Sequence, residues 1–142
     1  MTAYVAILET TTLSLGASPV DFTDQVKKVV LTVQVEKKDV TTFAALGAKV
    51  LAGGMESGSL KVDFVNDYTD NKLDELMWAA MKGRVPIAFS TQVAAGTVSA
   101  TNPKFTGSVL VSSWVPINGG PGDVAEVSCD LETSGPTTRN VT

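Results

Sequence analysis

The side chains in this sequence that could carry out catalysis or bind a ligand are its carboxylates, one cysteine and two tryptophans, because the sequence contains no histidine. Glu126 and Asp130 could form an acid–base pair for hydrolysis, and both fall on one face of an alternating segment. Residues four apart on a strand are separated by roughly 13 Å at about 3.3 Å per residue. That exceeds the separation of the carboxylates in either glycosidase geometry. The pattern therefore favours a solvated acidic strand face over a catalytic pair.

Metal and phosphate sites are predicted to be absent. Asp63, Asp67 and Asp70 lie close together in sequence, but the glutamate that completes a calcium loop is missing. Gly53 and Gly58 have the spacing of a phosphate-binding loop, yet Ser59 stands where the lysine is required. No cofactor or metal is expected.

Cys129 is the single cysteine, so no disulfide can form within the chain. Its alternation with Ala125 and Val127 predicts a buried small hydrophobe. Trp78 and Trp114 are too far apart in sequence to indicate a ligand platform and are expected to be packing or interface residues. These observations predict a protein that is not an enzyme.

Composition limits the fold and the partners. The chain has 142 residues, 44% of them hydrophobic and only 6% aromatic, with many small and β-branched residues. That is typical of one mainly β domain. The net charge of −4 argues against binding nucleic acid through its phosphates. The sequence carries no pattern of a signal peptide or a membrane span, so we expect synthesis in the cytoplasm and no membrane.

Three segments define the expected core. Residues 27–36 and 60–65 alternate apolar and polar side chains and should pair as antiparallel strands. A last strand is expected to place Ala125, Val127, Cys129 and Leu131 on its inner face. The only convincing helix spans residues 70–83, with apolar residues at helical spacing, and Met77 and Met81 should pack on the sheet.

The chain is expected to divide into three parts, the middle one of which holds this core and one long loop. Residues 1–18 are predicted to be an N-terminal arm, residues 19–132 the β domain, and residues 133–142 a polar, extended C-terminal tail. Residues 37–57 form a long loop that is too apolar for a solvated linker. Either it buries its apolar side chains against something, such as another subunit, or it folds back on its own domain as an extra strand. Its apolar residues are Phe43, Leu46, Val50, Leu51 and Met55.

The order of these features resembles the major tail tube protein of long-tailed, non-contractile-tailed bacteriophages. The likeness covers nearly the whole chain and depends on the order of several loose motifs. These are residues 39–43 leading through 51–54 into the strand at 58–65, the helix end at 81–83, residues 102–107, the turn at 119–123 and the closing segment at 131–136.

The resemblance implies a β-sandwich or partial barrel with one flanking helix. Its copies assemble into hexameric rings that stack as a hollow tube for genome delivery. In such a tube, strands from neighbouring subunits complete a barrel around the lumen. The loop at 37–57 and the arm at 2–18 bridge subunits and rings.

The residues predicted to face the lumen come from the polar strand faces, and an acidic lining would repel DNA phosphates. They are Gln34, Glu36, Lys61, Asp63, Glu126, Ser128 and Asp130. The implied partners are other copies of the chain, a tape measure protein, a tail terminator and tail tip proteins, with DNA passing without specific binding. The implied location is the virion tail, assembled in the host cytoplasm.

Other interpretations remain. One is a related ring-forming tube protein of a secretion system, or a tail terminator or head–tail joining protein, which would stop at a single ring. Another is a monomeric β-sandwich that binds carbohydrate or protein, which should expose an aromatic platform. The last is an enzyme without a recognisable motif.

Overall fold

The described part of the chain folds as one antiparallel sheet flanked by one α-helix. The computed structural model describes residues 8–16, 20–70 and 72–142. In these residues the strands are β1 (Thr12–Leu15), β2 (Val20–Asp21), β3 (Val26–Asp39), β4 (Leu51–Val65), β5 (Ile87–Gln92), β6 (Lys104–Leu110), β7 (Glu126–Thr133) and β8 (Thr138–Asn140). The helices are α1 (Leu73–Gly83) and two short 3-10 turns, η1 (Thr23–Gln25) and η2 (Phe43–Ala45). The predicted mainly β fold with one flanking helix is confirmed.

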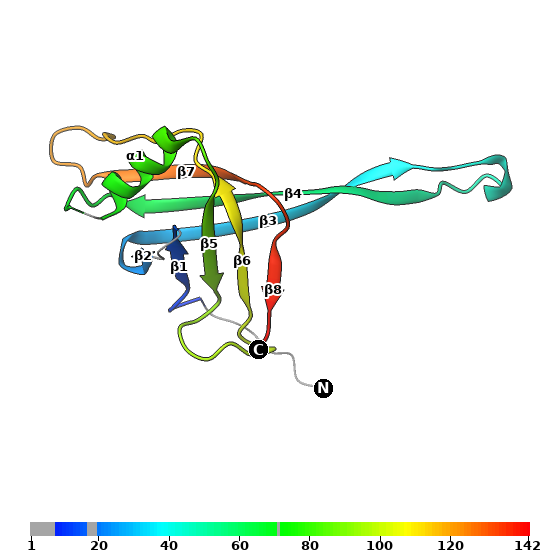
Figure 1. The fold of residues 1–142 in the computed structure, drawn as a ribbon, viewed down its shortest axis with the longest axis horizontal. Coiled ribbons are helices and arrows are strands. Elements are labelled where there is room, and N and C mark those ends of the chain that lie inside the picture. The colour runs from blue at the N-terminus through cyan, green and yellow to red at the C-terminus, as the bar shows by residue number, and fades with distance from the viewer. Residues whose placement is uncertain (1–7, 17–19, 71) are drawn as a thin grey trace.

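The sheet bends sharply at the contact between β6 and β7. Its order is β2-β1-β5-β6-β7-β4-β3, with β8 added to β6. β6 and β7 share only the pairs Val109↔Thr133 and Leu110↔Glu132. Strands β1, β5, β6 and β8 therefore form one half and β3, β4 and β7 the other, and the two halves cross at a steep angle (Figure 1). This is a partial barrel that does not close on itself.

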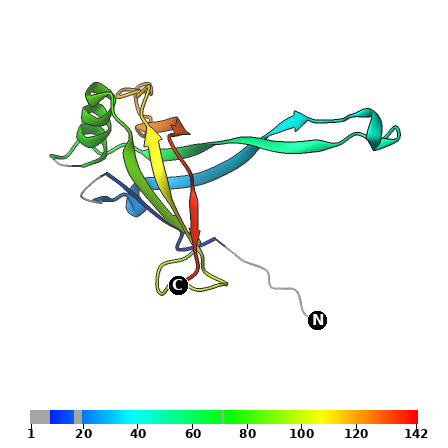
Figure 2. The same ribbon diagram turned by 45° about the vertical axis from the view of Figure 1, so that its right-hand side comes forward.

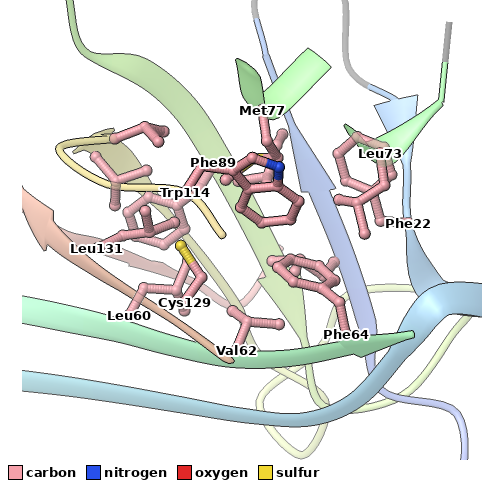
Figure 3. Close-up of a cluster of buried hydrophobic side chains, with 14 of the residues drawn as sticks. Phe22, Leu60, Val62, Phe64, Leu73, Met77, Phe89, Trp114, Cys129 and Leu131 are labelled. Atoms are coloured by element: carbon pink, nitrogen blue, oxygen red, sulfur yellow. The ribbon is translucent and has the colours of Figure 1, made fainter. Parts of the chain in front are cut away.

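The hydrophobic core fills the space between the two halves. Leu60, Val62 and Phe64 of β4 are buried, as the alternation predicts. Across the sheet they meet Leu131, Cys129 and Val127 of β7 in register. The Phe64 ring makes edge-on contacts with Phe22 and Trp114, at centroid distances of 6.5 and 6.1 Å (Figure 3). Such pairs add to the stability that burial provides.

Helix α1 covers one end of this core. Leu73 and Met77 are fully buried, and Met81 packs against the core, as predicted. The helix begins at Leu73, later than the predicted residue 70, because two hydrogen bonds of Asp74 hold its first turn in place. The Asp74 amide bonds to the Asp67 carbonyl at 3.1 Å. The Asp74 carboxylate accepts from the Trp114 indole at 3.0 Å.

The prediction that residues 1–18 are an arm is wrong for residues 12–15, which form β1. This strand lies inside the sheet between β2 and β5, and Leu13 and Leu15 are buried in the core. Four residues are too few for a clear alternation, so the sequence pattern did not reveal the strand. Residues 1–7, 17 and 18 of the predicted arm lie outside the described residues.

The expected C-terminal tail, residues 133–142, is in part a strand. β7 continues to Thr133, and β8 pairs with β6 through Thr138↔Thr106, Arg139↔Phe105 and Asn140↔Lys104. The Ser134 amide also donates to the Ser108 carbonyl at 2.8 Å. The segment is extended, as predicted, but it belongs to the sheet.

The predicted loop at residues 37–57 is strand at both of its ends. β3 runs on to Asp39 and β4 begins at Leu51, so only residues 40–50 form the turn. Neither alternative from the sequence describes this arrangement fully. The segment does extend two strands, but they project away from the body of the domain as a long two-stranded ribbon (Figures 1 and 2).

Candidate subunit interface

The carboxylates and the cysteine that the sequence offered for chemistry have structural roles. Ser128 donates to the Asp63 carboxylate at 2.7 Å, and Lys27 pairs with Glu126 at 2.6 Å. Burial raises the pKa of the Cys129 thiol to about 11, so it stays protonated at neutral pH and is a poor nucleophile.

No group of metal-ligating side chains occurs among the described residues. Over the same part of the chain, no helix is long and apolar enough to cross a membrane.

The most prominent surface is the ribbon formed by the far parts of β3 and β4. The two strands stay in register from Val26↔Phe64 to Asp39↔Leu51, with irregularities near Val26 and after Val35. β7 pairs only with residues 59–65 of β4. Beyond that point no third strand pairs with the ribbon among the described residues, and the ribbon is exposed on both faces. A free two-stranded ribbon is marginally stable in water by itself, so this one is suited to lie against another surface.

Hydrogen bonds hold the turn of the ribbon in one conformation. The Val40 amide donates to the Val50 carbonyl at 3.0 Å, and the Val50 amide donates to Thr41 Oγ1 at 2.8 Å. The Thr41 amide donates to the Asp39 carboxylate at 2.9 Å. Hydrogen bonds from the Thr41 side chain and amide lower the pKa of Asp39. The turn is therefore ordered before any partner arrives, which reduces the entropy lost on binding.

The ordered turn presents apolar side chains to solvent. Phe43 is 104% exposed and Leu46 is 93% exposed, and Leu46 has a left-handed backbone with φ 53°. The other predicted interface residues, Val50, Leu51 and Met55, are exposed as well. A group of exposed apolar side chains on one projecting segment is typical of a surface that contacts another protein. Burial of these five residues against another subunit remains a prediction.

Five of the seven residues predicted to face the lumen lie together on the outer face of β4 and β7. Lys61 stands opposite Asp130, Asp63 opposite Ser128, and Glu126 opposite Val65. Gln34 and Glu36 lie farther away, on the ribbon. These five side chains therefore share one face of the sheet, and the orientation of this face toward a lumen remains a prediction.

The outer face is less acidic than the sequence suggests. Glu126, Asp130 and Glu132 make an acidic stripe along β7. Lysines from the neighbouring strands lie beside it, because Lys61 faces Asp130, Lys28 faces Asp63 and Lys27 pairs with Glu126. Surface pairs of this kind add little stability but reduce the local field.

Sequence reasoning missed two exposed apolar regions. Val33 and Val35, expected on a half-buried face, are 45% and 56% exposed because the inner face of β3 continues past the body. A second region, at the end of the molecule opposite the ribbon, is the loop before β7 (Figure 1), where Val115, Ile117 and Val124 are exposed. In the sequence, the apolar residues on both sides of the turn at 119–123 could have indicated this second exposed region.

Comparison with known proteins finds similarity in structure alone. No family model and no curated protein matches the sequence. One similar solved chain belongs to a virion of a native gene transfer agent particle. Its TM-score is 0.74 at 16% identity, over 92% of this chain and 95% of that one. Another belongs to the tail of an empty gene transfer agent particle, determined with helical refinement and C6 symmetry. Its TM-score is 0.69 at 14% identity, over 91% and 96%. The chain therefore has the fold of subunits found in these particles.

Proposed function

We propose that this protein is a structural, non-enzymatic subunit of a phage-type tail. Its copies form hexameric rings that stack into a tube through which a genome leaves the particle. The observation that carries the proposal is the ordered ribbon with a fully exposed apolar turn. A solitary protein gains nothing from such a feature, whereas an assembling subunit buries it. Support comes from the shared fold with chains of a virion and of a six-fold symmetric tail.

The free edge of the sheet supports assembly by strand pairing. β3 stands at one end of the sheet order and has 14 residues, while β2 at the other end has two. A long unpaired edge attracts a strand from another chain. In the proposed ring, the β3 edge of each subunit meets the sheet of the next, so the ring closes into one barrel and leaves no edge exposed.

The outer face of β3, β4 and β7 would then line the lumen. Residues proposed there are Lys61, Asp63, Glu126, Ser128 and Asp130, with Gln34 and Glu36 on the ribbon. The acidic stripe along β7 keeps DNA phosphates from adhering, while the interleaved lysines limit the repulsion. The lining allows passage of DNA and gives no specific binding.

The proposal places the protein in the virion tail, after assembly in the host cytoplasm. Besides its own copies, the expected partners are a tape measure protein inside the tube, a tail terminator at one end and tail tip proteins at the other. The ribbon would bridge subunits and rings.

Electron microscopy of the purified, concentrated protein tests the proposal. We expect rods with a central hole and six-fold symmetry in cross-section. Single rings that never stack would favour a terminator or joining protein. A species that stays monomeric at every protein and salt concentration would refute the proposal.

A further inference from the structure

An apolar groove lies between helix α1 and the strands beneath it. Its volume is about 380 Å³, and every residue that lines it is uncharged. Leu76 and Ala80 of α1 form one wall, and Leu15, Phe22 and Ile87 form the other. The volume falls within the range of about 300–1,000 Å³ that is typical of pockets holding a ligand. The groove can therefore accept one or two large apolar side chains.

The apolar turn of the ribbon matches this groove in chemistry. Residues 43–48 carry no charge, and Phe43 and Leu46 project fully into solvent. Charges that would oppose burial are confined to the flanks of the turn, at Asp39 and Lys49. The contact would thus need no buried charge, which is the usual obstacle to docking.

The turn lies at the opposite end of the molecule from helix α1 (Figure 1), which forms one wall of the groove. From Val33 to Val40 the ribbon spans roughly 23 Å, at about 3.3 Å per residue. A domain of this size has a radius of gyration of about 14 Å. The straight ribbon therefore cannot bring its turn to the groove of its own copy, but it projects far enough beyond its own body to contact a neighbouring copy.

We propose that the turn of one subunit, with Phe43 and Leu46, docks into the α1 groove of the next subunit. This inference rests on the proposed function and names the surface that receives the ribbon. The two surfaces differ, so the contact is head-to-tail, and a contact of this type closes into rings or continues as an open polymer. Each contact between a turn and a groove is small. Because the contact is repeated at every subunit, the contacts together stabilise the assembly.

Cysteine cross-linking tests the contact. Leu46→Cys and Ala79→Cys are introduced on separate proteins, which are mixed at assembling concentration and oxidised. Ala79 lines the groove and is exposed, and the buried Cys129 should not compete. We expect a dimer on a non-reducing gel. Leu46→Cys with Leu8→Cys is the control, because Leu8 lines a different apolar hollow together with Val33 and Phe105.

A charge in the groove provides a second test. Ala79→Glu should raise the protein concentration needed for assembly at least tenfold, whereas Ala100→Glu, exposed in another loop, should leave it unchanged. Thermal unfolding of both variants checks that they fold. The inference is overturned if wild-type rods form while Leu46→Cys cross-links only to Leu8→Cys, or if Ala79→Glu assembles normally. Absence of rods from the wild-type protein would instead refute the proposed function.

Discussion

Phe43→Ser is the most direct perturbation of the proposed assembly. Because Phe43 is 104% exposed in the single subunit, its replacement should change the free energy of unfolding by less than about 0.5 kcal/mol. Burial of a phenylalanine at an interface is worth about 1.5–3 kcal/mol. Since about 1.4 kcal/mol corresponds to a factor of ten, loss of the ring should raise the concentration needed for assembly about 10- to 150-fold.

The assay is sedimentation of rods over a series of protein concentrations, with electron microscopy of the pellet. Phe43→Leu is the matched control, because it keeps an apolar side chain and should shift the assembly concentration by less than about tenfold. Thermal unfolding of the dilute protein verifies that both variants fold equally. Assembly of Phe43→Ser at the wild-type concentration would show that the turn is not buried, and the reasoning from its exposure would be wrong.

Four further outcomes are expected. Leu13→Ala should lower the free energy of unfolding by about 2–5 kcal/mol because Leu13 is fully buried, whereas Leu8→Ala, 67% exposed, should change it by less than about 0.5 kcal/mol; denaturant titration compares them. Gly58→Ala should destabilise the fold by about 1–3 kcal/mol in the same assay, since its Cβ would lie 2.5 Å from the Thr32 carbonyl oxygen. Because burial raises the Cys129 pKa to about 11, the folded state holds this proton longer than the unfolded state does. Stability measured by thermal unfolding should therefore fall as the pH rises from about 9 to 11, and Cys129→Ser should remove that part of the dependence. Asp130→Lys with Glu126→Lys should leave rods intact but slow DNA release from particles, and release at the normal rate would remove the electrostatic argument for the lumen.

The interior of the fold was predictable because its signals are local. Alternation along residues 60–65 and 125–131 identified the buried faces of β4 and β7, since successive side chains on a strand point to opposite sides. The helical spacing around Met77 identified the face of α1 that packs on the core. The absence of histidine and the lone cysteine limit the possible chemistry whatever the fold, because no arrangement of the chain can supply a side chain that it lacks.

Long-range pairing decided the rest. β1 is too short to show a pattern, and it becomes a strand because β2 and β5 lie on either side of it. The alternation in β3 continues past the body of the domain, so it predicted burial for Val33 and Val35, which only the missing third strand leaves exposed. The sequence determined which side chains are apolar and at what period. The tertiary structure decided which of them find a partner within the chain, because burial depends on neighbours that local spacing does not specify.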